Sequence, residues 1–195
     1  SQHCFAIYPI IARMMGARVV TVPSRDLGHD LPAMRAAVTD ATTVMFVANP
    51  NNPTGTLASP DAVRALVEGL PPHVLLVMDE AYVEFLERPV DLLPAIRAGS
   101  PANLLLMRTF SKIHGLAGLR LGYGLANPEL IGALVVRGVQ DLAGEVVETG
   151  VGRHLREPVV TVGDHDAVVA QGLPTTVALD RHVPPVPHRL DPHDR

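Results

Sequence analysis

Three continuous apolar runs, each five or six residues long, constrain the fold of this chain more than any other feature. They span Thr43 to Ala48, Val74 to Met78 and Leu104 to Arg108, and helical patterns separate them. Runs of this length suit strands that are buried on both faces, as in a parallel sheet covered by helices. The alternation predicts an α/β fold, with a mostly parallel sheet and helices on both faces joined by right-handed crossovers.

Local signals predict further elements of the same domain. Ser59 and Pro60 are typical of an N-cap followed by the first helical position, and an amphipathic helix should run on to residue 70. Asp30 similarly predicts a short helix that ends near residue 38. A fourth apolar run, from Arg18 to Val22, is expected to join the sheet.

Composition narrows the classes of function. A net charge of -4 and a pI near 6.1 leave no broad basic surface, so we expect neither nucleic acid nor an anionic membrane as a partner. The apolar stretch from Phe5 to Ala17 is too short to span a bilayer and is interrupted by Pro9 and Arg13. Cys4 is the only cysteine, which excludes an intrachain disulfide and favours the reducing cytoplasm.

The pattern of the sequence changes beyond residue 135. Residues 1–135 predict part of one large α/β domain, whereas residues 136–195 keep no long helical or strand period. The last stretch, from Pro174 to Arg195, is rich in proline and histidine and is typical of loop or disorder. We interpret residues 136–195 as a divergent tail, frame-shifted or disordered. Because the chain begins with Ser1 rather than methionine, we also expect it to be a fragment.

Lys112 is the only lysine in a chain that has 15 arginines. It follows the third apolar run within the sequence Thr109-Phe110-Ser111-Lys112. A partly desolvated lysine loses its proton more easily and becomes a nucleophile, which suits imine formation with a carbonyl compound. The position of Lys112 therefore suggests that it takes part in such chemistry.

Polar clusters follow all three apolar runs, at residues 49–55, 79–82 and 109–112. Each cluster alone has an ordinary explanation: a turn for the first, a helix cap at Asp79 for the second, and a surface position for Lys112. In open parallel sheets, however, ligands bind outside the carboxyl ends of the strands. Three clusters in this position therefore predict one shared site.

These clusters resemble the motifs of a known family. Asn-Pro-Asn-Asn-Pro-Thr-Gly at residues 49–55, Asp-Glu-Ala-Tyr-Val-Glu-Phe at 79–85 and the segment Thr109 to Tyr123 are together similar to fold-type I pyridoxal-phosphate aminotransferases of class I/II. Within that group they are most similar to the histidinol-phosphate aminotransferases. The resemblance covers residues 1–134 and implies the large domain of such an enzyme, incomplete at both ends.

The resemblance assigns chemical roles to four residues. Lys112 would form an imine with the aldehyde of pyridoxal 5'-phosphate and would then move a proton as general base and acid. Asp79 would pair with the protonated pyridine nitrogen. Asn52 and Tyr82 would hydrogen-bond the 3′-oxygen of the ring.

Further residues match cofactor-binding positions of the family. Arg120 would bind the phosphate group through its guanidinium, and the hydroxyls of Ser111 and Thr109 would also face that phosphate. Phe5 would stack on the pyridine ring. Tyr8, in contrast, is interpreted as helix packing. The histidines show no recurrent ligand spacing, so no metal site is predicted.

The implied reaction is a transamination between an amino donor and a 2-oxo acid, in particular between histidinol phosphate and 2-oxoglutarate in histidine biosynthesis. The family resemblance also implies a cytoplasmic homodimer. Three alternatives remain: another class I/II aminotransferase, a related pyridoxal-phosphate decarboxylase, and an inactive fragment of such an enzyme. A cofactor-sensing domain of a transcription regulator is disfavoured, because no helix-turn-helix segment or basic stripe is present.

Overall fold

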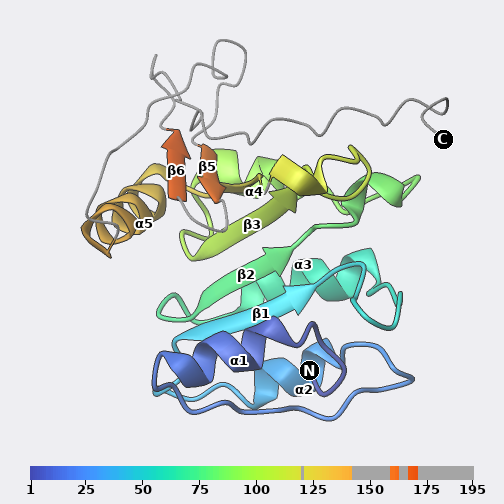
Figure 1. Cartoon of the computed structure of the whole chain (residues 1–195). Helices are drawn as coiled ribbons and strands as arrows, with labels where there is room; N and C mark the ends of the chain where they lie inside the picture. Colours follow the sequence, from blue (N-terminus) through green and yellow to red (C-terminus); the bar gives the residue numbers. More distant parts are fainter. Residues whose placement is uncertain (120, 142–158, 163–166, 171–195) are drawn as a thin grey trace, which may run out of the picture.

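The computed structural model describes residues 1–119, 121–141, 159–162 and 167–170 (Figure 1). Its elements, in chain order, are α1 Ile7–Met14, α2 Leu31–Ala36, β1 Val44–Ala48, α3 Pro60–Gly69, β2 Leu75–Asp79, the 3-10 turn η1 Val83–Phe85, α4 Leu93–Ala98, β3 Leu104–Thr109, the 3-10 turn η2 Ala117–Leu119, β4 Gly122–Leu125, α5 Pro128–Asp141, β5 Val159–Val162 and β6 Ala167–Ala170. The three predicted strands are confirmed as β1, β2 and β3.

The described strands form one sheet in the order β1-β2-β3-β4-β5-β6. The first three strands are parallel, with Ala48 opposite Asp79 and Asp79 opposite Met107. The pairings from β3 through to β6 are antiparallel. The α/β class is therefore confirmed, and the parallel part of the sheet is the part that the apolar runs predict.

The predicted fourth strand, from Arg18 to Val22, is wrong. Residues 18–22 have no strand conformation. The Val22 carbonyl accepts a hydrogen bond from the Gln2 amide at 2.7 Å, which ties this stretch to the beginning of the chain. Val20 is 55% exposed. An apolar run without a neighbouring strand to pair with does not become part of a sheet.

Both predicted helix starts are confirmed by their caps. The Asp30 carboxylate accepts the amide of Ala33 at 2.9 Å, and the Ser59 hydroxyl accepts the amide of Ala62 at 3.3 Å. Each bond satisfies an amide of the first helical turn, which has no partner within the helix.

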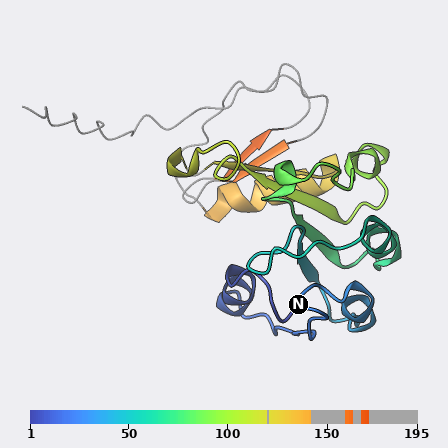
Figure 2. The same cartoon turned by 90° about the vertical axis from the view of Figure 1, so that its right-hand side faces the viewer.

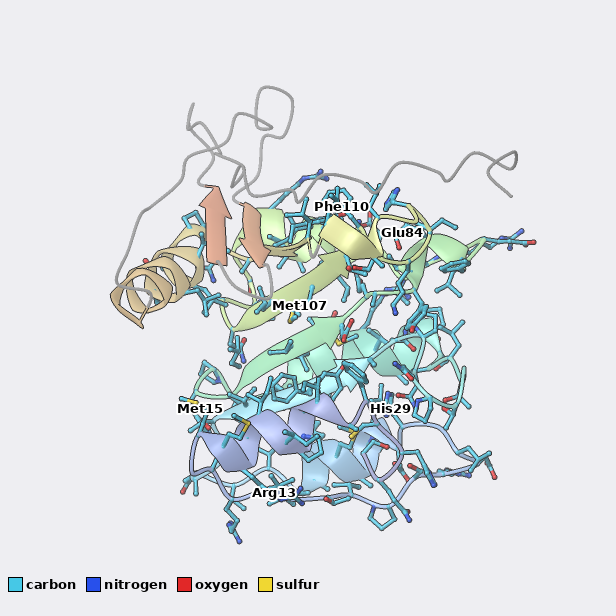
Figure 3. All side chains as sticks on the ribbon, in the orientation of Figure 1. Arg13, Met15, His29, Glu84, Met107 and Phe110 are labelled. Carbon is cyan, nitrogen blue, oxygen red and sulfur yellow. The ribbon has the colours of Figure 1, made fainter. Side chains whose placement is uncertain are left out.

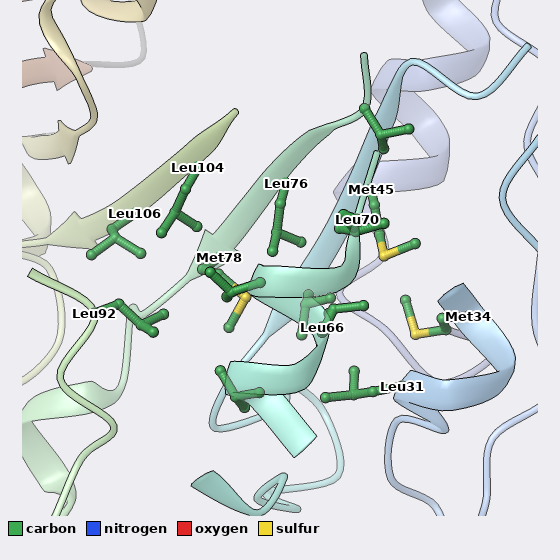
Figure 4. Packing of buried hydrophobic residues seen from close by; sticks show 14 of the residues in the cluster. Leu31, Met34, Met45, Leu66, Leu70, Leu76, Met78, Leu92, Leu104 and Leu106 are labelled. Carbon is green, nitrogen blue, oxygen red and sulfur yellow. The ribbon is translucent and has the colours of Figure 1, made fainter. Parts of the chain in front are cut away.

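Helices cover both faces of the sheet, as Figure 2 shows from the side. On one face, α2, α3 and α4 pack on side chains such as Met78 and Leu106, and Figure 4 shows this packing around Leu66 of α3. On the other face, α5 packs on a smaller cluster that includes Val77 and Leu105. Neighbouring residues of a strand therefore face opposite layers.

The predicted division of the chain at residue 135 falls within α5. Most of residues 136–195, including the stretch from Pro174 to Arg195, lies outside the described residues, so the division stays a prediction. Within the described part of the chain, no helix is long and apolar enough to cross a membrane.

Candidate active site

The turn after β1 is held by Asn49, which is 6% exposed. Its side-chain oxygen accepts a hydrogen bond from the backbone amide of Ala58 at 2.9 Å, and its backbone amide donates to the Asp79 carbonyl at 2.9 Å. The second bond extends the β1–β2 pairing to the edge where both strands end. Asn49 therefore has a structural role that brings the first polar cluster beside the second.

Asn51 stabilises the same turn from inside. It is 3% exposed, and its side-chain amide donates to the His3 carbonyl and to the Thr54 hydroxyl, each at 2.8 Å. Asn52, the predicted site residue, is half-buried instead. Asn49 and Asn51 shape the turn, and of the three asparagines in this cluster Asn52 is the one that is not buried.

Asp79 ends β2 with both carboxylate oxygens engaged. Oδ1 accepts the Ala81 amide at 3.0 Å, and Oδ2 accepts the hydroxyl of Tyr8. Tyr8 lies on α1 and is 8% exposed; its ring stacks on that of Phe46 with 4.8 Å between centroids. The carboxylate is therefore held in one orientation by contacts from two separate parts of the chain.

Tyr8 contacts the predicted site residue Asp79, although the sequence predicts helix packing for it. Burial raises the pKa of the Tyr8 phenol far above its usual value, and the negative charge of Asp79 raises it further. The phenol consequently stays protonated and remains a hydrogen-bond donor. Its ring meets that of Phe5, which precedes α1, edge to face at 5.6 Å.

The segment after β3 forms a tight loop that presents Lys112. The Thr109 hydroxyl accepts the Ser111 amide at 3.1 Å and donates to the Leu121 carbonyl at 3.3 Å. The Gly115 amide donates to the Lys112 carbonyl at 2.9 Å, and Gly115 has a φ of 68°, a conformation that favours glycine. Thr109 thus uses its hydroxyl to build the loop, whereas Ser111 is half-buried.

Lys112 and Tyr82 meet at this edge of the sheet. The Lys112 Nζ lies 5.2 Å from the centroid of the Tyr82 ring, within the range of a cation–π interaction. Tyr82 lies three residues after Asp79, so the loops after β2 and β3 bring the carboxylate, the phenol and the amine to one end of the sheet. Phe5 is 41% exposed beside Tyr8.

Arg120, the predicted phosphate ligand, lies outside the described residues. Among the described residues, no group of three or more His, Cys, Asp or Glu side chains could hold a metal ion.

Residues 1–143 match the family model for aminotransferase class I and II. The match covers well over half of the chain and includes all three polar clusters. This protein therefore belongs to the class I and II aminotransferase family.

Individual relatives carry two different substrate names. The chain is 54% identical over 136 residues to a histidinol-phosphate aminotransferase of Ralstonia nicotianae, covering 69% of this chain and 36% of that protein. It is 51% identical over 132 residues to an aromatic amino acid aminotransferase of Mycolicibacterium vanbaalenii, covering 67% and 37%. The chain thus spans about a third of the length of these relatives.

A solved structure shows the same fold. The histidinol-phosphate aminotransferase of Sinorhizobium meliloti, in complex with pyridoxal-5'-phosphate, matches with a TM-score of 0.63 and 38% identity. The match covers 70% of this chain and 37% of that one. The described fold is therefore that of part of a fold-type I aminotransferase.

The substitution Tyr8→Phe tests the contact with Asp79. It keeps the ring that stacks on Phe46 but removes the donor, and a hydrogen bond to a charged group contributes about 1.5–3 kcal/mol. We expect the free energy of unfolding, measured by urea denaturation at pH 7, to fall by about that amount.

The same variant carries a pH signature. The folded chain keeps the Tyr8 proton, whereas the unfolded chain releases it above about pH 10. This contribution to stability is therefore complete below pH 10 and is lost as the pH rises further. The difference between parent and Tyr8→Phe should narrow above pH 10. Equal stability of the two proteins at pH 7 would contradict the contact.

Proposed function

We propose that this protein is a pyridoxal-phosphate-dependent transaminase that moves an amino group between histidinol phosphate and 2-oxoglutarate. The observation that carries the proposal is the meeting of Lys112, Tyr82 and an oriented Asp79 at the carboxyl edge of β1, β2 and β3. When bound, the cofactor supplies an aldehyde that condenses with amines and a protonated ring that withdraws electrons.

Lys112 is the residue that would hold the cofactor covalently and later move the substrate proton. It is the one lysine of the chain, and its Nζ lies over the Tyr82 ring rather than in an ion pair with a described carboxylate. Lys112 is exposed over the face of Tyr82 and not desolvated, so it is accessible to a carbonyl compound. It would act as nucleophile and general base once its proton has been transferred.

Asp79 suits a partner that carries a proton on a ring nitrogen. Two donors already fix its carboxylate, so its charge is oriented before a cofactor binds. A negative charge held in this way keeps a bound pyridine nitrogen protonated. Tyr8 acts through Asp79 as a positioning residue, because its hydroxyl contacts the carboxylate.

The remaining polar residues fit the edges of the same cofactor. Asn52 and Tyr82 carry donors for the ring 3′-oxygen, and Phe5 offers an exposed aromatic face for stacking. We assign Ser111 to the phosphate ahead of Thr109, because the Thr109 hydroxyl already bonds within the loop. Arg120 remains the proposed phosphate-binding arginine.

A second candidate is an aromatic amino acid aminotransferase. The relative from Mycolicibacterium vanbaalenii favours it, at 51% identity over 132 residues. The two candidates share the residues that would bind the cofactor. They differ in the amino donor, and an assay with two donors separates them.

Covalent binding of the cofactor is the first expected result. Purified chain mixed with pyridoxal 5'-phosphate should gain the near-visible absorbance band that this cofactor shows when bound to an amine. The band should disappear in Lys112→Ala, whereas a Lys112→Arg variant should keep the charge and also lack the band. A parent protein without the band would sink the proposal and favour an inactive fragment.

Substrate choice is the second expected result. With 2-oxoglutarate as acceptor, glutamate formation should be at least about tenfold faster with histidinol phosphate than with phenylalanine, which is the discrimination that a few specific contacts supply. The Lys112→Ala protein gives the background rate for both donors. Faster turnover of phenylalanine would transfer the proposal to the aromatic class.

The proposal includes the cytoplasmic homodimer that the family resemblance implies. Apolar side chains on α1 support a subunit contact, since Ile10, Ile11 and Met14 are 47%, 48% and 79% exposed. Light scattering of the purified chain should give twice the mass of one chain. A single-chain mass at concentrations where the cofactor binds would contradict the dimer.

A further inference from the structure

A partly buried ion pair lies at the same end of the sheet as the proposed cofactor site but on its opposite face. The Arg108 Nε donates to Glu80 Oε2 at 2.8 Å, and the two side chains are 22% and 5% exposed. The roles proposed above for Lys112 and Asp79 make no use of either residue. Side chains alternate along a strand, so Glu80 faces the α2–α4 layer, whereas Asp79 faces α1.

The ion pair joins the two strands that carry the chemistry. Glu80 directly follows Asp79, and Arg108 precedes Lys112 by four residues. The Glu80 amide also donates to the Met107 carbonyl at 2.8 Å. The β2–β3 pairing is therefore closed by a backbone bond and a side-chain bond at the point where the two loops leave the sheet.

Arg108 is held from the side of β4 as well. It lies opposite Tyr123 in the antiparallel register, and the Phe110 amide donates to the Leu121 carbonyl at 3.1 Å. The Phe110 and Tyr123 rings lie 5.5 Å apart between centroids. Figure 3 shows Phe110 and Glu84 at this carboxyl end of β3, beyond Met107. The start of the Lys112 loop is thus fixed to both neighbouring strands.

Burial and the neighbouring charges have opposing effects on the pKa values of Glu80 and Arg108. Burial raises the pKa of Glu80, the Arg108 charge opposes that rise, and Glu84 and Asp91 add to it. Burial alone would lower the pKa of Arg108, but Glu80 and the Tyr123 hydroxyl together raise it. Well-packed apolar residues often replace a buried ion pair without loss of stability. A gain in stability is therefore a weak reason for an ion pair at this position. Contacts on both sides of Arg108, to Glu80 and to β4, instead favour a role in orienting the start of the Lys112 loop.

We propose that Glu80 and Arg108 are positioning residues, which set the distance between Asp79 and Lys112 across the β2–β3 ladder so that both reach one cofactor. The inference rests on the proposed function and deepens it. A shift of about 1 Å in a reacting group lowers activity by up to about a hundredfold. A contact that fixes the relative position of the two loops therefore has a large effect on activity.

The test compares the parent with Glu80→Leu, Arg108→Met and the double variant that carries both changes. Three quantities are measured: the urea midpoint, the dissociation constant for pyridoxal 5'-phosphate, and the rate at which a dilute acylating reagent modifies Lys112 without cofactor. Peptide mass spectrometry assigns that rate, because Lys112 is the only lysine.

Each single variant should lower the urea midpoint, because it leaves one buried charge without its partner. The double variant should recover the midpoint of the parent. Its cofactor affinity should nevertheless stay about tenfold weaker, and its Lys112 acylation rate should differ from the parent's by about threefold. The matched control removes the exposed pair Asp61 and Arg64, which are 3.3 Å apart on α3, and should change none of the three quantities.

Parent values of all three quantities in the double variant would show that apolar residues replace the pair without any loss, and would overturn the inference. Should the double variant not fold, Arg108→Lys replaces it, since lysine keeps the charge without the planar fork. Fragmentation of the peptide in the mass spectrometer then distinguishes acylation of Lys112 from acylation of the lysine introduced at position 108. A near-parent midpoint with altered Lys112 acylation then supports the inference, and unchanged acylation overturns it.

The rate of Lys112 acylation, which is measured without cofactor, tests this inference independently of the proposed function. If the parent binds no cofactor, the proposed transaminase fails. The Lys112 rate still decides whether the ion pair places the loop: a rate that changes in the double variant supports the placement, and a rate that stays at the parent value contradicts it.

Discussion

The parallel pairing of β1, β2 and β3 is the constraint on which the rest of the structure depends. Parallel strands all end at the same edge, so the polar residues after each strand are brought together although they are far apart in sequence. The register places Ala48, Asp79 and Met107 side by side at that edge. Asn52, Tyr82 and Lys112 follow within a few residues.

A polar contact on each face of the sheet stabilises this edge. On the α1 face, Tyr8 reaches Asp79 from 71 residues away and fixes the carboxylate. On the α2–α4 face, Glu80 and Arg108 join β2 to β3. Strand alternation lets both contacts act on adjacent residues without interfering with each other. The proposed cofactor site thus depends on a buried polar contact in each layer.

Much of the fold could be predicted from the sequence, because continuous apolar runs and capping residues are local signals. The runs that became β1, β2 and β3 and the caps at Asp30 and Ser59 are of this kind. The run from residue 18 to 22 is also rich in valine but has no strand beside it, and the composition of a run does not show whether it pairs with another strand. The antiparallel β4 was also missed, since Gly122 to Leu125 is short and rich in glycine. Tyr8 could not be recognised as a site residue, because a tyrosine on an apolar helix face is typical of a core until its distant partner is known.

Chemical trapping of the bound cofactor shows directly which amine holds it. Reduction of the chain with borohydride after mixing with pyridoxal 5'-phosphate fixes the cofactor to the amine that holds it, and only Lys112 and the chain terminus are amines. Peptide mass spectrometry then identifies the site. We expect the reduced adduct on the Lys112 peptide at one per chain, strongly diminished in Tyr8→Phe. An adduct confined to the chain terminus, or spread equally between both amines, would show that Lys112 is not the residue that holds the cofactor.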